Sequence, residues 1–325
     1  MDIPPILIDQ IKTGGVLLFL GSGAAIGASH PDKATPPVGS DLSRLIADRF
    51  LGSAFYDRPL TQVSELAISE TDLLSVQSYV ADLFMDFYPA DFHKLIPKFT
   101  WKAIATTNYD LILERAYDLV PDRCQKLVVF KKNIEQVEDK LKSPGSVCYY
   151  KLHGCITDIN DPKIPLILTS DQYITATKGR NRLFERVEGL AYEYPIIFVG
   201  HSLSDFDIRA ILLEISEIGE VRPRSYIVAP HMTPEDQRFW ESRRFTCIKS
   251  NFSDFMNQID SCIEKPFRKL ATLKTDREHP FFDDFCPSDV LKPSESVMTL
   301  LNRDMEYIHR RYKSPKSDPR AFYKG

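Results

Sequence analysis

The chain has 325 residues, 43% of them hydrophobic, and a formal net charge of -4 at pH 7. That length suits one large domain or two ordinary ones with a sizeable core, and the slight acidity argues against direct nucleic-acid binding. The amino terminus lacks the basic and apolar regions of a secretory signal, and the apolar runs are too short to span a bilayer. We therefore expect a cytoplasmic protein that does not bind membranes.

The first strong element is an apolar run at residues 16–20, which follows a short helix predicted over residues 3–13. The run stops at Gly21, and Gly23 and Gly27 follow, which is the pattern of a buried parallel strand that turns into a phosphate-binding loop. Glycines let the backbone approach a pyrophosphate, and the N–H groups of a following helix favour the anion. Because the spacing is one residue off G-x-G-x-x-G, a plain tight turn is the alternative interpretation.

Strands and helices alternate along the rest of the first 265 residues. This alternation predicts an α/β fold with a Rossmann-like, doubly wound parallel sheet. Helical inserts are expected at residues 50–100 and 115–145, where they would form an insert subdomain. Strands are predicted at residues 102–106, 147–152, 165–168, 195–199, 225–229 and 245–249, and helices from residue 40, within 60–99, over 111–119 and 181–193, from 205, and over 234–242 and 253–263.

The pattern changes near residue 266, where the strand periodicity is lost. We expect residues 1–265 to form one domain, and residues 266–325 to form a carboxyl-terminal extension or a linker that leads to a further domain. Five prolines interrupt this last part of the chain, at Pro280, Pro287, Pro293, Pro315 and Pro319.

Polar or glycine-bearing clusters follow four of the predicted strands. The carboxyl ends of parallel strands share one edge of the sheet, so the clusters are expected to meet there. Each cluster could also be purely structural, because a histidine at a strand end often packs in the core, and an asparagine or aspartate often caps a helix. The clusters are Gly21-Ser22-Gly23-Ala24, Thr107-Asn108-Tyr109-Asp110, Lys151-Leu152-His153-Gly154 and Gly200-His201-Ser202-Leu203.

In this order the clusters resemble the sirtuin family, and specifically its divergent bacterial branch of NAD-consuming effectors in anti-phage defence. The resemblance covers residues 10–265 and includes the segment 168–173. It implies that Asn108 and His153 are catalytic and that Asp110 lies beside the nicotinamide. It further implies that Gly21, Ser22 and Gly23 hold the pyrophosphate and that Gly200, His201 and Ser202 contact the adenosine ribose side. Ala24 and Asp205 complete the implied set of NAD-binding residues.

The chemistry of NAD⁺ agrees with these residue types. Nicotinamide is a cationic leaving group, so its glycosidic bond breaks through an oxocarbenium-like transition state that needs positioning, a dry pocket and one base. His153, with an ordinary pKa near 6.5, would take a proton from a ribose hydroxyl or a water. The Asn108 amide would orient the ribose, and the Asp110 carboxylate would stabilise the developing positive charge.

The chain departs from the protein-deacylating sirtuins, which carry a zinc module held by two cysteine pairs. Here no two cysteines have C-x2-C or C-x4-C spacing, so we expect free thiols and no bound metal. The departure favours plain hydrolysis of NAD over deacylation. The six cysteines are Cys124, Cys148, Cys155, Cys247, Cys262 and Cys286.

The sequence therefore predicts an NAD⁺ glycohydrolase that uses NAD as its substrate, releases nicotinamide and ADP-ribose, and depletes NAD in abortive infection. The resemblance also implies a homo-oligomer and an activating partner or sensor domain. One alternative is an NAD-dependent deacylase or ADP-ribosyltransferase, and another is a non-catalytic module that senses NAD or ADP-ribose. An ordinary dehydrogenase fits less well, because the third glycine is out of register with its fingerprint.

Overall fold

A computed structural model of the chain describes residues 3–133, 145–201 and 223–268. The chain divides into two units, Met1–Thr275 and Asp276–Gly325, and all described residues belong to the first unit. Among the helices of these described ranges, none is long and apolar enough to cross a membrane.

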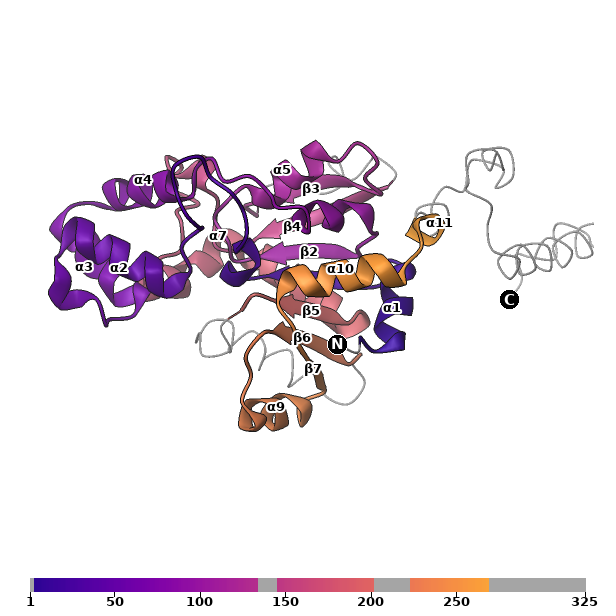
Figure 1. Cartoon of the computed structure of the whole chain (residues 1–325). Helices are drawn as coiled ribbons and strands as arrows, with labels where there is room; N and C mark the ends of the chain where they lie inside the picture. Colours follow the sequence, from indigo (N-terminus) through magenta and orange to yellow (C-terminus); the bar gives the residue numbers. More distant parts are fainter. Residues whose placement is uncertain (1–2, 134–144, 202–222, 269–325) are drawn as a thin grey trace, which may run out of the picture. The chain divides into compact units, whose positions relative to one another are not determined.

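A seven-stranded sheet, parallel throughout, forms the centre of the first unit (Figure 1). Its strand order, β3-β4-β2-β1-β5-β6-β7, confirms the predicted doubly wound α/β fold. From β1 the chain first builds one half of the sheet and then crosses to β5 to build the other half. The strands are β1 (Leu17–Leu20), β2 (Ala103–Thr106), β3 (Lys126–Phe130), β4 (Ser146–Lys151), β5 (Ile196–Val199), β6 (Ser225–Ala229) and β7 (Phe245–Lys249).

The register of the central strands brings their carboxyl ends level. Leu20, the last residue of β1, pairs with Thr106 of β2 and with Val199 of β5. Thr106 in turn pairs with Lys151, the last residue of β4. The four clusters that follow these strands therefore begin at one edge of the sheet. The strand order reverses between β1 and β5, which is where ligands bind in open α/β sheets.

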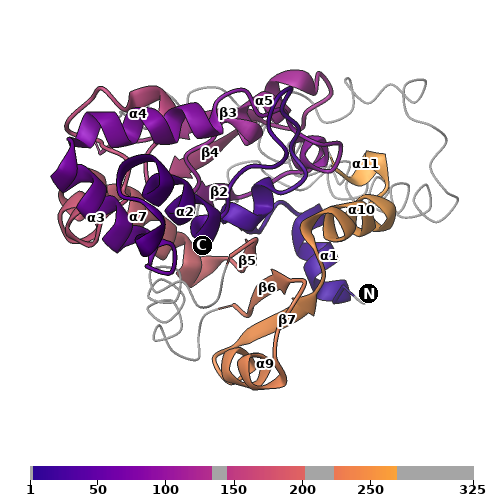
Figure 2. The same ribbon diagram turned by 60° about the vertical axis from the view of Figure 1, so that its left-hand side comes forward.

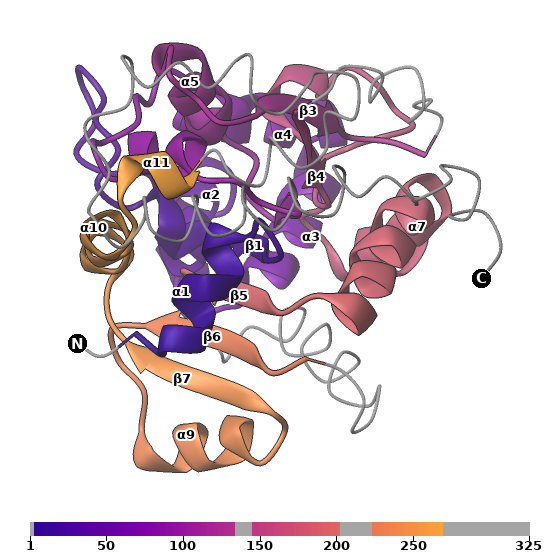
Figure 3. The same cartoon turned by 90° about the vertical axis from the view of Figure 1, so that its right-hand side faces the viewer.

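Helices cover both faces of the sheet. Successive residues of a strand point to opposite faces, and in the central strands the residues on both faces are apolar. On one face, Leu18 and Ile104 pack with side chains of α1, α5 and α10. On the other face, Leu17 and Phe19 pack with side chains of α7 and α9. Figure 3 shows α7 and α10 on opposite sides of the strands. These helices are α1 (Pro5–Lys12), α5 (Ile112–Leu119), α7 (Ser170–Glu193), α9 (Pro234–Glu241) and α10 (Phe252–Cys262), with a short α11 (Lys265–Arg268) after them.

Three further helices form the first of the predicted helical inserts. They are α2 (Gly39–Phe50), α3 (Leu60–Glu70) and α4 (Leu73–Phe84), which pack together in the chain region between β1 and β2 (Figure 2). Their apolar core also includes Tyr109, Leu166 and Leu168, which come from the loops after β2 and β4. The insert therefore packs against the edge of the sheet that carries the clusters.

The second predicted insert, at residues 115–145, is only partly helical. Residues 126–130 form β3, which pairs in parallel with β4 at the edge of the sheet. Its Leu-Val-Val-Phe sequence is rich in residues that favour strands, and its burial alternates as expected for an edge strand. Residues 134–144 lie outside the described part of the chain.

The strand predicted at residues 165–168 is also wrong, because this segment is buried but has no strand neighbour. Its backbone donors are satisfied elsewhere. The N–H of Leu166 donates to the side-chain oxygen of Gln77 over 2.6 Å. The N–H of Ile167 donates to the carbonyl oxygen of His153 over 3.0 Å. Because apolar composition alone does not distinguish a strand from a buried loop, the sequence could not separate them.

Candidate functional site

The glycine loop after β1 lies directly against the turn after β5. The N–H of Gly23 donates to the carbonyl oxygen of Gly200 over 2.7 Å, and the N–H of Gly21 donates to that of Val199 over 2.8 Å. A Cβ on Gly200 would lie 2.1 Å from the backbone nitrogen of Ala24, and one on Gly21 would lie 2.5 Å from Nδ1 of His201. Only glycines fit at this contact, so the two turns form one unit.

A short 3-10 turn, η1 (Ser22–Ala25), follows Gly21, where the sequence suggested the amino end of a helix. The N–H groups of Gly21, Gly23 and Ala24 all donate to carbonyl oxygens of the protein. The side chain of Ser22, in contrast, is exposed. The loop therefore offers an exposed hydroxyl group at this edge of the sheet. Three of its backbone N–H groups are already used in hydrogen bonds within the protein.

Asn108 is fixed on this loop. Its side-chain amide donates to the carbonyl oxygen of Gly21 over 2.9 Å. Its backbone N–H donates to Oγ1 of Thr106 over 3.0 Å, and that hydroxyl donates to the carbonyl oxygen of Leu20 over 2.9 Å. Asn108 is half-buried, so its amide is both held by the protein and accessible at the edge of the sheet.

Asp110 is buried at the start of α5, with 5% of its surface exposed. Its Oδ1 accepts from the N–H of Ile112 over 2.9 Å, which is a capping role. Its Oδ2 is buried and has no hydrogen-bond partner among the described residues. Burial raises the pKa of Asp110, while the nearby Lys151 lowers it. The carboxyl group thus has one oxygen that caps α5 and one buried oxygen whose hydrogen-bonding capacity is unused among the described residues.

Lys151 is fully buried beneath this part of the site. Its ammonium donates to the backbone carbonyl of Asp110 and lies 3.0 Å from Oε1 of Glu114. Burial acts to lower the pKa of Lys151, but the Glu114 carboxylate reverses this effect, so the net shift is upward. The lysine is therefore a charged link between β4 and the start of α5.

His153 is buried in the turn after β4, with 5% of its surface exposed. Burial, together with smaller contributions from Arg180 and His201, lowers its pKa to about 3. The ordinary pKa near 6.5 assumed from the sequence is therefore wrong for this structure, and the imidazole is neutral at pH 7.

His201 lies against the glycine loop and the core of β1. Its ring lies 5.0 Å from the ring of Phe19, centroid to centroid, and its Nδ1 adjoins Gly21. Burial lowers the pKa of His201 to about 3, while the backbone of Phe19 acts in the opposite direction. Its Nε2 is buried without a hydrogen-bond partner in the described ranges.

Hydrogen bonds and close approaches join six residues of the predicted site: Gly21, Gly23, Ala24, Asn108, Gly200 and His201. Ser22 is exposed in the same loop, and Asp110 and His153 are buried in the turns after β2 and β4. Ser202 and Asp205, the two other predicted members, lie in residues 202–222, outside the described part of the chain.

Arg180 is a residue of this region that the sequence analysis missed. It lies on α7 with 1% of its surface exposed. Its Nη2 donates to the carbonyl oxygen of Pro165 over 2.8 Å, and its Nε donates to that of Lys131 over 3.2 Å. A Cβ on Gly154 would lie 3.1 Å from the same Nη2. Because these partners are distant in sequence, no local pattern could have indicated the role of Arg180.

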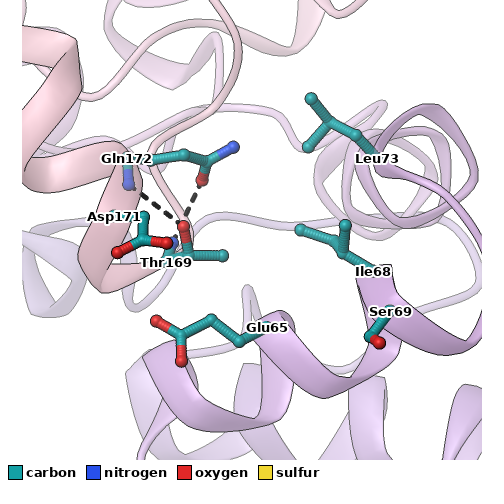
Figure 4. Close-up of a pocket in the computed structure, with 7 residues that line it drawn as sticks. All are labelled: Glu65, Ile68, Ser69, Leu73, Thr169, Asp171 and Gln172. Carbon is teal, nitrogen blue, oxygen red and sulfur yellow. Dashed lines mark hydrogen bonds between the residues drawn. The ribbon is translucent and has the colours of Figure 1, made fainter.

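A cavity of about 470 Å³ lies between α3 and the start of α7 (Figure 4). Thr169 and Gln172 on its wall form a reciprocal capping box, in which each side chain accepts from the backbone of the other over 3.1 and 3.0 Å. The segment 168–173 therefore begins a helix, which is a structural role. The seven lining residues are Glu65, Ile68, Ser69, Leu73, Thr169, Asp171 and Gln172, and none belongs to the four clusters.

The described ranges contain no group of three or more His, Cys, Asp or Glu side chains placed to bind a metal ion.

Comparisons with known proteins found one matching family model and several solved structures of similar fold. Residues 102–248 match the family described as the SIR2-like domain. The crystal structure of a Sir2 homologue in complex with NAD superposes with a TM-score of 0.51, at 13% identity, over 82% of this chain and 96% of that one. A Sir2 homologue variant in complex with ADP-ribose has a TM-score of 0.47 at 14% identity, over 79% of this chain and 95% of that one. No curated protein sequence matches the chain.

The matched segment contains β2 to β6, all but the last residue of β7, and three of the four clusters, and the glycine loop precedes it. At such low identity the structural likeness shows the fold and no more. The chain therefore contains a SIR2-like region, and it has the fold of the Sir2 homologues.

Proposed function

We propose that this protein is an NAD⁺ glycohydrolase, which cleaves the nicotinamide–ribose bond and releases nicotinamide and ADP-ribose. The observation that carries the proposal is the hydrogen bond from the Asn108 amide to Gly21. It joins a candidate catalytic side chain to a glycine turn at the point where the strand order reverses. The SIR2-like match and the fold shared with a Sir2 homologue that is seen with NAD support it.

Three features of the site fit a dinucleotide. The glycine loop after β1 and the turn after β5 meet where the strand order reverses, which is where dinucleotides bind in open α/β sheets. The exposed hydroxyl of Ser22 can donate to a phosphate oxygen. Two buried polar atoms, Oδ2 of Asp110 and Nε2 of His201, have no partner in the described ranges, and the amide and hydroxyl groups of NAD can supply one.

The neutral state of His153 changes the expected chemistry. With its pKa lowered to about 3, the imidazole is a weak base, but it can still accept a hydrogen bond from a ribose hydroxyl or an attacking water. Because nicotinamide already leaves as a neutral molecule from a cationic precursor, the site needs little acid catalysis. We assign His153 and Asn108 to orienting the ribose and the water, and Asp110 to the nicotinamide side.

The proposal extends to the biological role that the sequence resemblance implies. Under this extended proposal, the protein is a cytoplasmic, NAD-depleting effector of bacterial anti-phage defence. It acts as a homo-oligomer and is switched on by a partner or a sensor domain. The resemblance of the motif set is the support for this extension.

A non-catalytic NAD or ADP-ribose sensor is the second candidate, and the low pKa of His153 favours it. To test the two, the full chain is incubated with NAD, with and without candidate activators, while free nicotinamide is followed. A glycohydrolase releases nicotinamide and ADP-ribose in equal amounts. A sensor binds ADP-ribose in calorimetry and leaves NAD intact under every condition. An acylated peptide in a parallel reaction tests the deacylase alternative.

A further inference from the structure

His93 lies far from the four clusters in sequence, but it contacts the glycine loop. It begins a 3-10 turn, η3 (His93–Lys98), between the insert helices and β2, and only 2% of its surface is exposed. Both ring nitrogens are hydrogen-bonded. The N–H of Ala90 donates to Nδ1 over 3.0 Å, and Nε2 lies 2.7 Å from the carbonyl oxygen of Ala24.

These two contacts fix the tautomer of the ring. The backbone nitrogen of Ala90 can only donate, so Nδ1 must be the unprotonated nitrogen. The proton of the neutral imidazole is therefore on Nε2, which donates it to the carbonyl of Ala24. Burial lowers the pKa of His93 to about 4, which agrees with a ring that is neutral at pH 7.

The neighbouring Phe92 supports the other end of the same loop. Gly27 has a positive φ of 97°, and a Cβ on it would lie 3.0 Å from Cε1 of Phe92. The rings of Phe92 and His93 lie with centroids 4.0 Å apart and planes tilted by 35°, and the ring of Phe252 of α10 packs edge-on against Phe92 at 5.5 Å. Consecutive residues thus hold the loop at two points, one by a hydrogen bond and one by packing.

The loop is therefore held from two directions. On the sheet side, Gly200 accepts from Gly23, and Asn108 donates to Gly21. On the side of the insert, Nε2 of His93 bonds to the carbonyl oxygen of Ala24. Further along, Ala25 and Ala28 pack with Phe87, and Ser29 pairs with Tyr88. Ala24 lies in η1, the turn that follows β1 and lies against Gly200 after β5. Loss of the His93 bond would release this turn without removing any group that touches a ligand.

We propose that His93 is a positioning residue, which holds the glycine loop, through the Ala24 carbonyl, in the shape that receives the dinucleotide. The inference rests on the proposed NAD site for its functional consequence, but the loop contact itself does not depend on it. It assigns a role in binding to the insert between β1 and β2, beyond the packing of its helices.

Two substitutions separate the two bonds of the ring. In His93→Gln the side-chain amide reaches about as far as Nε2, so it can still donate to Ala24. In His93→Asn the side-chain oxygen lies about where Nδ1 lies, so it can still accept from Ala90 but no longer reaches the loop. Each variant keeps one bond and loses one, which makes their global stabilities comparable. The exposed His231→Asn serves as a control for the chemistry of the substitution.

The first measurement is hydrogen exchange of the loop amides in the protein without nucleotide. His93→Asn should speed exchange in residues 21–27 by on the order of fivefold to tenfold relative to His93→Gln, as expected for one lost hydrogen bond. The second is ADP-ribose affinity by calorimetry, where His93→Asn should raise Kd about tenfold and His93→Gln about twofold at most. At saturating NAD, His93→Asn should release nicotinamide at a rate near that of wild type. This result would show that the substitution weakens binding and leaves the chemical step unchanged, as a positioning role requires.

Equal exchange and equal Kd in the two variants would overturn the inference. If wild type binds neither NAD nor ADP-ribose, the proposed function fails, while the exchange comparison still decides the role of His93. A further measurement needs no variant. The ¹⁵N shifts of the His93 ring in wild type should report a proton on Nε2, and a proton on Nδ1 would contradict the assignment.

Discussion

The carbonyl oxygen of Gly21 accepts two hydrogen bonds of 2.9 Å, one from the backbone N–H of Ala24 and one from the side-chain amide of Asn108. Both lone pairs of this oxygen are therefore used, one within the loop and one across the sheet edge. The loop after β1 and the turn after β2 are thereby held as one piece. A change at either residue is expected to affect the other.

The contact between Gly200 and the glycine loop predicts a severe effect of adding one methyl group. In Gly200→Ala the new Cβ would overlap the backbone nitrogen of Ala24, and the φ of 71° is unfavourable for alanine. The variant should unfold at a lower temperature and lose ADP-ribose binding, as measured by calorimetry.

The matched control is Gly189→Ala on α7, where no atom lies within 4 Å of the added Cβ. Alanine in a helix interior stabilises by about 0.5–1 kcal/mol over glycine, so this variant should unfold at a slightly higher temperature and bind normally. Normal ligand binding by Gly200→Ala would show that the two turns do not need their close approach.

The buried histidines predict that stability falls as the solution is acidified. His93 has a folded-state pKa of about 4, below the ordinary 6.5, so the unfolded chain takes up the proton first. Its contribution to stability is present above pH 6.5 and is lost as the pH falls toward 4. The loss should approach about 1.4 kcal/mol per pH unit for this one residue, and His153 acts in the same direction.

Urea unfolding of wild type and His93→Gln at pH 7 and pH 5 measures this effect. Wild type should lose more stability between the two conditions than the variant, because glutamine does not titrate. If the variant loses as much as wild type, the His93 ring does not have the depressed pKa given by its burial.

The buried ion pair of Lys151 predicts a stability effect that a second substitution repairs. Lys151→Met leaves the Glu114 carboxylate without its partner, and the backbone carbonyl of Asp110 without its donor. Breaking a buried pair in this way costs about 3–5 kcal/mol. The double variant Lys151→Met with Glu114→Gln should recover part of the loss in denaturant unfolding. No recovery would mean that the pair is not coupled.

The sheet was largely predictable, because its central strands are short apolar runs that end in glycine or polar residues. β1, β2 and β5 are buried along their whole length, and runs of this length and composition between helices are typical of buried parallel strands. β3 was missed because it lies in a charged stretch. The segment 165–168 was misassigned because a buried loop can be as apolar as a strand.

The site was predictable only where its residues follow strands. Asn108, His153 and Gly200 were found because strand ends meet at one edge, whatever the loops do. His93 and Arg180 come from helical regions, and their contacts cross 69 and 15 residues of chain, so no local spacing indicates them. The low pKa of His153 could not be predicted from the sequence either, because it depends on burial and on the charges around the ring.

The proposed NAD cleavage depends most on the side chain of Asn108, and one comparison of variants tests that role directly. Nicotinamide release from NAD is measured for wild type and for Asn108→Ala under the same activating condition. Thr233→Ala, which removes the side-chain cap of α9, a helix that contributes no residue to the four clusters, serves as the control for loss of a helix cap. We predict release by wild type and by Thr233→Ala, and a loss of at least about a hundredfold in Asn108→Ala. Normal release by a folded Asn108→Ala protein would contradict the proposed site.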